Sequence, residues 1–419
     1  MTKKSDAPAI RFKGFSDAWE QRKLGDVVQI TMGQSPDGST YSDEPSDYIL
    51  VQGNADLQNG WVCPRIWTTQ ITKKADAGDL IMSVRAPAGA MGKTAYNAVI
   101  GRGVAAIKGN EFIYQLLVKM DADGFWKTLS CGSTFESLNS DNIKNAEVKI
   151  PTTAEQIKIG GYFQQLDNLI TLHQRKFEKL TNVKKSMLEK MFPQNGSSYP
   201  EIRFKGFTDP WEQRKVSDLA EKTYGGGTPT TSNEAYWNGD IPWIQSSDVA
   251  DGKLLGVESR KRITQDGLNN SSAQLIPENS IAIITRVGVG KLAFMPYSYA
   301  TSQDFLSLSK LNAEPFFTVY ACYKKLQSEL NAVQGTSIKG ITKDELLAKS
   351  IMVPQYAEQR QIGAFFKQLD HLITLHQRKG KAAVSGCSND ANNSKGVCCK
   401  ARDFGYKCHK KDEPNRFDA

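Results

Sequence analysis

Polar side chains that could read DNA bases lie among glycine, aromatic and basic residues in two stretches of the sequence, 27–148 and 219–352. Arginine suits guanine, asparagine and glutamine suit adenine, and serine or threonine suits either base. The candidates are Gln52, Asn54, Arg85, Lys93 and Arg102 in the first stretch, and Gln245, Ser246, Ser247, Arg286, Lys291, Ser302 and Gln303 in the second. A solvated surface position explains any single one more simply, so the prediction depends on the whole set.

A second motif, PAGAMGKT from Pro87 to Thr94, comes close to the phosphate-loop pattern GxxxxGK[ST]. It lacks the first glycine, and the AYNAVIGRG that follows has strand and turn character where a phosphate loop continues into a helix. The corresponding VGVGKLAF from Val287 has no hydroxyl residue after its Gly-Lys. We therefore do not predict a nucleotide site here.

Motifs for catalysis are not found elsewhere in the sequence. There is no NPPY-like adenine-methylation motif, no His/Glu pair with metal-ligand spacing and no nucleophile elbow. Three of the four histidines, His173, His371 and His376, lie on one repeated helical segment, and the equivalent positions of His173 and His376 favour packing over catalysis. This pattern is typical of a binding protein.

Internal repeats place the two candidate stretches in equivalent surroundings. IRFKGFSDAWEQRKLGD from Ile10 matches IRFKGFTDPWEQRKVSD from Ile202 at 13 of 17 positions. AEQIKIGGYFQQLDNLITLHQRK from Ala154 matches AEQRQIGAFFKQLDHLITLHQRK from Ala357 at 17 of 23 positions. Each half of the chain is therefore one variable block between two shared blocks.

The second shared block is predicted to be a long helix, because its apolar residues alternate steps of four and three as in a heptad seam. In the first copy it extends from Glu155 to Phe192 and ends before Pro193. The seam, which we expect to form the interface of a helix pair, consists of Ile159, Phe163, Leu166, Ile170 and His173 in the first copy and Ile362, Phe366, Leu369, Ile373 and His376 in the second.

A single helix of this length needs a partner, and the second copy is the natural one. If the two run antiparallel, they place the variable blocks at opposite ends of a spacer, although ordinary packing of two helices explains the repeat as well. Short strands mixed with helical stretches predict an α+β fold. We therefore expect two pseudo-repeated α+β domains joined by two long antiparallel coiled-coil-like helices.

Composition is compatible with this interpretation. The 419 residues suit about two domains, and 39% apolar and 23% charged residues are typical of a globular protein. A net charge of +8 permits a polyanionic partner without requiring one. Because the sequence has no run of about 18 apolar residues and no signal-peptide core, we expect a cytoplasmic protein with no membrane partner.

Two divergent blocks, each followed by a near-identical helix, resemble the specificity subunit of type I restriction-modification systems. The resemblance covers residues 1 to about 379 and is carried by GGGTPTTSNEAYWNGDIPWIQSSDV from Gly225 and VPQYAEQRQIGAFFKQLDHLI from Val353. It implies target-recognition domains at 1–153 and 194–356, each reading half of a split sequence in double-stranded DNA. It also implies spacer helices at 154–193 and 357–379, the second one shortened.

The resemblance further implies that the chain is non-catalytic and holds no cofactor or metal. Its partners would be two methyltransferase subunits, which use S-adenosylmethionine for adenine methylation, and restriction subunits that use ATP and Mg. Two alternatives remain open at this point. One is an enzyme that acts on nucleic acid by itself, and the other is a structural protein that bridges other proteins without DNA.

The chain departs from the repeat after Lys379, where the next seam positions are Gly380, Ala383, Cys387 and Asp390. We therefore expect the second helix to end near Lys379 and the tail 380–419 to be flexible. Zinc is the alternative, but the spacing of Cys387, Cys398, Cys399, Cys408 and His409 lacks paired CxxC knuckles. The first helix would then expose an apolar stripe along its distal half, 177–191, for lack of a partner.

Overall fold

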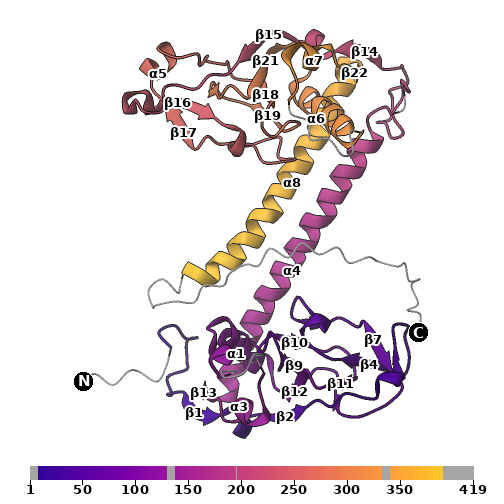
Figure 1. The fold of residues 1–419 in the computed structure, drawn as a ribbon, viewed down its shortest axis with the longest axis vertical. Coiled ribbons are helices and arrows are strands. Elements are labelled where there is room, and N and C mark those ends of the chain that lie inside the picture. Colours follow the sequence, from indigo (N-terminus) through magenta and orange to yellow (C-terminus); the bar gives the residue numbers. More distant parts are fainter. Residues whose placement is uncertain (1–7, 130–136, 195, 333–339, 390–419) are drawn as a thin grey trace. The chain divides into compact units, whose positions relative to one another are not determined.

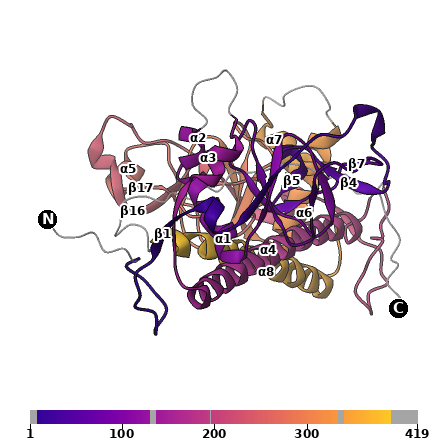
Figure 2. The same cartoon turned by 90° about the horizontal axis from the view of Figure 1, so that it is seen from below.

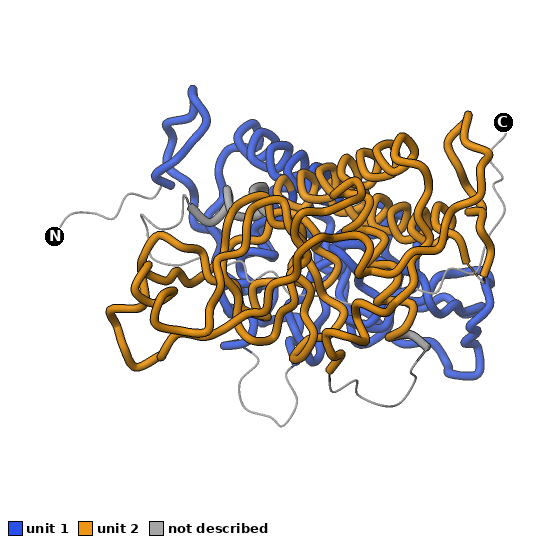
Figure 3. The backbone as a smooth tube through the Cα atoms, turned by 90° about the horizontal axis from the view of Figure 1, so that it is seen from above, with its two compact units in different colours: residues 1–171, 380–419 blue, residues 172–379 orange. Residues whose placement is uncertain are grey.

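The computed structural model describes residues 8–129, 137–194, 196–332 and 340–389. The chain divides into two compact units, Met1–Thr171 with Gly380–Ala419 and Leu172–Lys379, which Figure 3 shows in separate colours. Two long helices, α4 (Thr153–Lys190) and α8 (Tyr356–Asn389), contain the boundaries between the units. Both units mix helices and strands, so the predicted α+β class is confirmed.

In its described residues, the first unit contains two sheets and a separate strand pair (Figure 1). The inner sheet has the order β2 (Gln29–Met32), β12 (Val104–Lys108), β9 (Leu80–Ser83), β10 (Met91–Lys93), β6 (Trp61–Val62) and β5 (Leu57–Gln58). The outer sheet has the order β3 (Tyr41–Ser42), β7 (Ile66–Thr68), β4 (Tyr48–Val51), β11 (Ala98–Ile100) and β8 (Lys74–Ala75). The pair is β1 (Glu20–Lys23) with β13 (Glu147–Ile150).

Helices of the first unit cover the face of the inner sheet that the outer sheet leaves free. They are α1 (Glu111–Ala122), α2 (Phe125–Leu129), α3 (Ser140–Lys144) and the short 3-10 helix η1 (Leu24–Asp26), whose buried side chains share one core. Two further 3-10 helices, η2 (Gly38–Thr40) and η3 (Asn54–Asp56), adjoin strands β3 and β4 of the outer sheet in the chain. Leu80 and Met82 of β9 pack with Phe112 of α1, whereas Ile81 packs with Ile100 of the outer sheet. Strand β9 is therefore apolar on both faces because both are covered.

The second unit repeats this plan with fewer strands among its described residues. The inner sheet has the order β15 (Ala220–Gly225), β21 (Phe305–Leu311), β18 (Ser280–Ile284) and β19 (Leu292–Met295), and the outer sheet has β17 (Lys261–Ile263), β16 (Trp237–Ile244) and β20 (Ala300–Thr301). Strand β14 (Glu212–Lys215) pairs with β22 (Ser350–Val353). The pairing repeats that of β1 with β13, because the shared block EQRK supplies both first strands.

The second unit contains the last part of α4, α5 (Gln265–Asn269), α6 (Pro315–Ala332), α7 (Lys343–Ala348) and most of α8, with the 3-10 helices η4 (Val216–Leu219), η5 (Glu234–Tyr236) and η6 (Ser246–Asp248). Ile281 and Ile283 of β18 pack with Phe317 of α6, and Ile284 packs with Ile244 of the outer sheet. The two units thus share a three-layer order of helix, inner sheet and outer sheet.

Identical ion pairs join the two shared blocks in each unit. Arg11 donates to both carboxylate oxygens of Glu155 at 2.8 and 2.6 Å, and Arg203 donates to both oxygens of Glu358 at 2.8 Å. Both glutamates are buried. A bidentate arginine fixes the carboxylate in orientation as well as position, so the start of each long helix is tied to the start of its own half of the repeat.

Each long helix also contacts its domain through a glycine. A Cβ atom at Gly160 would lie 2.7 Å from the Phe112 backbone nitrogen, and one at Gly363 would lie 2.9 Å from the Phe317 nitrogen. Figures 1 and 2 both show α1 beside the first part of α4, which agrees with this close approach. A side chain at either position would push α1 or α6 away from the long helix.

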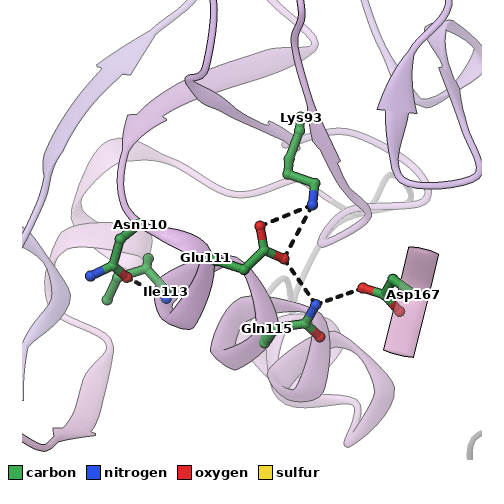
Figure 4. Close-up of polar contacts among 6 residues, drawn as sticks. All are labelled: Lys93, Asn110, Glu111, Ile113, Gln115 and Asp167. Carbon is green, nitrogen blue, oxygen red and sulfur yellow. Dashed lines mark hydrogen bonds and ion pairs between the residues drawn. The ribbon is translucent and has the colours of Figure 1, made fainter. Parts of the chain in front are cut away.

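A repeated aspartate completes the attachment of helix to domain. In the first unit, Gln115 donates from its amide to Asp167 (2.8 Å) and to Glu111 (3.1 Å), and Glu111 accepts from Lys93 at 3.0 Å (Figure 4). Burial is the largest of the effects that raise the pKa of the Asp167 carboxyl. In the second unit the equivalent Asp370 accepts from the Tyr320 hydroxyl and from Lys184, at 2.5 and 2.6 Å.

Within the second unit, α4 and α8 run antiparallel along His173–Lys190 and Tyr356–Lys379. His173 Nδ1 lies 2.9 Å from His376 Nδ1, and Lys184 reaches Asp370. His173 and His376 occupy equivalent positions in the two copies of the helix. Their contact therefore places a pseudo-twofold axis of the helix pair between the two side chains. The partner of Ile362, Phe366 and Leu369 is the stretch that contains Leu188 and Met191, together with α6.

One expectation about the helices is therefore wrong. The distal half of α4 is covered, since Leu188 and Met191 are buried and Leu180, Val183 and Met187 pack on the same core. Ile159 packs against the core of the first unit, and its predicted place in the helix-pair interface stays a prediction. Periodicity identified the apolar face correctly, but it could not tell whether a domain or a second helix covers that face.

Helix α8 does not end near Lys379, as the sequence predicted, but continues to Asn389. One glycine costs a helix only about 1 kcal/mol relative to alanine, and Lys381, Ala382 and Ala383 are strong helix formers, so Gly380 does not stop it. Residues 390–419, with Cys398, Cys399, Cys408 and His409, and the side chain of Cys387 lie outside the described residues. The flexible tail and its zinc alternative stay predictions.

Candidate nucleic-acid interface

Two parallel strands of the first outer sheet end side by side and place candidate residues together. Strand β11 pairs with β4 so that Ile100 lies opposite Val51. Gln52 follows β4 directly, and Gly101 and Arg102 follow β11, with the Gly101 nitrogen donating to the Val51 carbonyl at 2.8 Å. Parallel pairing thus gathers side chains that are about fifty positions apart in the sequence.

The second unit repeats this arrangement with strands β16 and β20. Ile244 lies opposite Thr301, and the Ser302 nitrogen donates to the Ile244 carbonyl at 2.9 Å. Gln245 follows the first of these strands, whereas Ser302 and Gln303 follow the second. Position by position, Gly101 therefore corresponds to Ser302 and Arg102 to Gln303.

The glycine-rich opening of each block approaches these strand ends closely. A Cβ atom at Gly33 would lie 2.1 Å from the Gly101 carbonyl oxygen, and one at Gly226 would lie 1.8 Å from that of Ser302. Only glycine allows this approach. Two residues on, the Ser35 hydroxyl accepts the Arg102 backbone N–H at 3.1 Å, and the Thr228 hydroxyl donates to the Gln303 amide oxygen at 2.6 Å.

A fourth loop reaches the same place from the inner sheet. The Val84 nitrogen donates to the Gly103 carbonyl, and the Thr285 nitrogen donates to the Asp304 carbonyl, both at 2.8 Å. Arg85 and Arg286 come next in the chain, and both are exposed. We call the four converging segments of each unit the loop edge: 33–35, 52–54, 84–86 and 101–103 in the first, and 226–228, 245–247, 285–287 and 302–304 in the second.

Most residues expected to contact DNA lie on the loop edges. In the first unit Gln52, Asn54, Arg85 and Arg102 are brought together there, and in the second unit Gln245, Ser246, Ser247, Arg286, Ser302 and Gln303 are. Lys291 lies beside them, because its carbonyl accepts the Ile284 N–H at 2.9 Å where β18 ends. The Ser302 side chain is buried and bonds to Asp304 at 3.2 Å, so it shapes the loop.

Lys93 is not on the loop edge. Its ammonium group lies 3.0 Å from Glu111 and 4.4 Å from the centre of the Tyr114 ring, and only 13% of its side chain is exposed. Gly92 and Lys93 form part of strand β10. The pairing of Met91 with Met82 makes Lys93 equivalent to Phe294, since Leu292 pairs with Ile283.

Sequence reasoning missed two arginines at the loop edges. Arg65 precedes β7 and Arg260 precedes β17, strands that run antiparallel to β4 and β16, so the register places them opposite Val51 and Ile244, the last residues of those strands. Arg65 pairs with Asp56 at 2.8 Å and Arg260 with Asp248 at 3.3 Å. Both aspartates are buried, whereas the arginine side chains are 47% and 69% exposed.

The same aspartates hold the loops that follow β4 and β16. Asp56 accepts the Gln52 backbone N–H at 2.7 Å, and Asp248 accepts that of Gln245 at 3.1 Å. A buried carboxylate is stable when it is hydrogen-bonded and paired with a cation. Asp56 and Asp248 each have both, a backbone N–H donor and an arginine. The available signal was an aspartate shortly after each glutamine, in QGNAD and QSSD.

The loop edges therefore combine exposed arginines with amides and hydroxyls on backbones that short contacts hold in place. Such side chains can bind phosphate or the edges of bases. The near-match to a phosphate loop has no such geometry, because Thr94 leads toward strand β11 and not into a helix. Within the described ranges, no three His, Cys, Asp or Glu side chains are grouped for a metal, and no helix is apolar and long enough to span a membrane.

Comparison with known proteins places both halves of the chain in one family. The family model for the type I restriction modification DNA specificity domain matches residues 16–182 and again 208–384. The putative type I restriction enzyme MjaX specificity subunit of Methanocaldococcus jannaschii is 29% identical over 180 residues, which is 41% of each chain. The EcoR124I/EcoR124II specificity subunit of Escherichia coli is 32% identical over 159 residues, 36% of this chain and 39% of that one.

These matches span about two fifths of the length of the relatives. The crystal structure of a type I restriction-modification S subunit from M. genitalium superposes with a TM-score of 0.63 at 11% identity, over 91% of this chain and 97% of that one. At this identity the likeness shows a shared fold.

Proposed function

The chain belongs to the type I restriction modification DNA specificity family, and we propose on that basis that its two domains each read one part of a split DNA sequence. The matched segments cover both halves, so the proposal applies to each domain. We further propose that the protein acts in the cytoplasm and contributes no catalytic residue of its own. The recognised target would be double-stranded DNA.

One observation supports the proposal most strongly: the loop edge is built twice with the same backbone contacts and different side chains. Gly33 and Gly226 make the same close approach, and Val84 and Thr285 make the same hydrogen bond. Yet Arg102 is replaced by Gln303 at the equivalent position. A shared frame with variable side chains is what reading two unrelated half-sites requires.

Charge supports the same surface. The loop edge of the first unit carries Arg85 and Arg102 with Arg65 beside them, and that of the second carries Arg286 with Arg260 and Lys291 beside it. The buried side chains of Asp56 and Asp248 neutralise one arginine at each loop edge, Arg65 and Arg260. Basic residues that neutralise phosphates supply the sequence-independent part of DNA affinity.

Partners form the second part of the proposal. As in the family, two methyltransferase subunits that use S-adenosylmethionine and restriction subunits that use ATP and Mg would supply the chemistry. The first part of α4 supports a partner surface, because Ile157, Tyr162 and Leu169 are exposed there at 66%, 49% and 48%. Tyr162 and Leu169 are seven residues apart and so lie on one side of the helix, and exposed apolar side chains on one side favour burial by another protein.

Exchange of residues 27–148 for the block of another family member tests the modular reading. The hybrid and the unmodified chain, each with the methyltransferase partner, select duplexes from a randomised library. We expect the hybrid to change one half-site and to keep the other, because the second domain is untouched. A change in both half-sites, or in neither, would contradict the proposal, and selection of no sequence by the unmodified chain would favour a bridging protein.

A further inference from the structure

The two loop edges can be compared residue by residue, because strand pairing fixes which positions correspond. Gly101 and Ser302 both donate their backbone N–H to the last residue of the neighbouring parallel strand. Arg102 and Gln303 come next, and each is held by the hydroxyl two residues beyond the glycine of the opening loop. These two side chains therefore occupy one position of the repeated frame.

A residue type that is the same in both domains cannot by itself make them read different sequences. The shared pairs are Gln52 with Gln245, Arg65 with Arg260 and Arg85 with Arg286. We assign the shared arginines to the phosphate backbone, which is the same at every sequence. Differences between the half-sites must come from positions where the domains differ.

Arg102 and Gln303 stand out among the differing pairs. Both are exposed, and both carry a side chain that can make two hydrogen bonds to one base. Asn54 and Ser246 also differ, but they begin the 3-10 helices η3 and η6 and are half-buried. Lys291 corresponds to Ala90, which has no polar group for a base.

We infer that the position held by Arg102 and Gln303 selects one base in each half-site, guanine through Arg102 and adenine through Gln303. Arginine donates to the O6 and N7 atoms of guanine, whereas glutamine accepts from N6 and donates to N7 of adenine. The inference rests on the proposed function and names the residue through which each domain discriminates.

The local contacts suit these roles. The Thr228 hydroxyl donates to the Gln303 amide oxygen at 2.6 Å, which orients the amide. The second lone pair of that oxygen can still accept from adenine N6, and the amide nitrogen is free to donate to N7. Ser35 holds the backbone of Arg102, so the main chain is fixed where the guanidinium begins. Among the described residues the Arg102 guanidinium has no hydrogen bond or ion pair, so binding to a base would break no internal contact.

Reciprocal substitutions test the inference in the full chain with its methyltransferase partner, by selection from a randomised duplex library. Arg102→Gln should change guanine to adenine at one position of the first half-site and leave the second half-site unchanged. Gln303→Arg should change adenine to guanine at one position of the second half-site. Each swap should reverse a preference of about 5- to 150-fold, the range for one bidentate base contact.

Gln213→Arg provides the matched control for added charge, because Gln213 is exposed on β14, which belongs to a separate strand pair. It should leave both half-sites unchanged, and melting temperatures check that all variants fold. Suppose that the unmodified chain selects a split site. Base preferences that stay unchanged in both swaps, or an affinity that changes equally on every sequence, would then overturn the inference and leave the proposed function standing. If the unmodified chain selects no split site, the proposed function fails and the inference fails with it.

Discussion

Arg85 and Arg286 follow buried inner strands and are exposed on the loop edges, so we expect both to contact phosphates. Arg85→Ala and Arg286→Ala should each weaken binding on all sequences and reduce the slope of log affinity against log salt by about 0.9. The measurement is affinity for one selected duplex and one scrambled duplex at several salt concentrations. Unchanged affinity and unchanged slope in both variants would exclude this role.

Lys93→Ala is the matched control for that experiment, since it removes a cation that already has a partner. Glu111 would lose its cation while only 16% exposed, so the domain should be less stable by about 1 to 3 kcal/mol. The salt slope and base preference should stay as in the unmodified chain. The readouts are thermal unfolding and the same binding series.

Residue types on the loop edges could be predicted from sequence, but their equivalence could not. GKT after Met91 and GKL after Val289 look alike, yet the strand register aligns Lys93 with Phe294. Register depends on which strands pair, which short motifs do not encode. Arg65 and Arg260 were missed for the same reason, because only antiparallel pairing brings them opposite Val51 and Ile244, where β4 and β16 end.

At the scale of elements, Gly160 fixes how closely α1 approaches α4. Gly160→Ala should lower stability by about 1 to 3 kcal/mol, because the added methyl would lie 2.7 Å from the Phe112 nitrogen. Gly161→Ala is the control: nothing lies within 4 Å of its Cβ position, and the second copy already has Ala364 there. The control should gain up to about 1 kcal/mol from helix propensity. Chemical unfolding measures both, and a stabilised Gly160→Ala variant would contradict the close packing.

The histidine pair makes the contact between α4 and α8 sensitive to pH. Burial lowers the pKa of His376, and the positive charges of His173, Lys176 and Lys379 add to this. The unfolded chain therefore takes up a proton first as pH falls below about 6.5. We expect the free energy of unfolding to decrease from that pH downward and to level off below the folded pKa.

Thermal unfolding between pH 5 and 8 measures this dependence, and His376→Gln should flatten it. His371→Asn serves as the control, because His371 is exposed on the same helix and the first copy has Asn168 at that position. An equal pH dependence in the unmodified chain and in His376→Gln would show that the pair does not control it.

For the molecule as a whole, the duplication was readable from sequence because shared blocks are nearly identical. The sequence also predicted the long helices and the α+β class, which follow from local periodicity. It did not reveal that the first part of each long helix packs against its own domain, through Arg11 and Gly160 in one half and Arg203 and Gly363 in the other. Those contacts join residues far apart in the chain.

The duplication also indicates what the chain lost after Lys379. In the second unit Lys184 pairs with Asp370 at 2.6 Å, and both side chains are nearly buried. The equivalent Asp167 has Gln115 as a donor, and its pKa is raised. By the repeat, the residue that corresponds to Lys184 is Cys387. We therefore predict that Asp167 lacks a lysine partner from the other long helix, such as Asp370 has in Lys184, and that the first half of α4 lacks part of its apolar cover.

Replacing residues 380–395 with FEKLTNVKKSMLEKMF, the sequence of 177–192, should restore a lysine partner for Asp167 and apolar cover for the first half of α4. The graft supplies a lysine at position 387 and, by the repeat, apolar residues opposite Phe163 and Leu166, the equivalents of Phe366 and Leu369, which share a core with Leu180, Val183 and Met187 in the second unit. We expect a higher melting temperature and tighter assembly with the methyltransferase partner, because a paired carboxylate and a covered apolar stripe are both favourable. Adding Asp167→Asn to the graft should remove the electrostatic part of the gain and leave the apolar part. A graft that melts no higher and assembles no better than the original chain would show that the first half of α4 needs no further cover from α8.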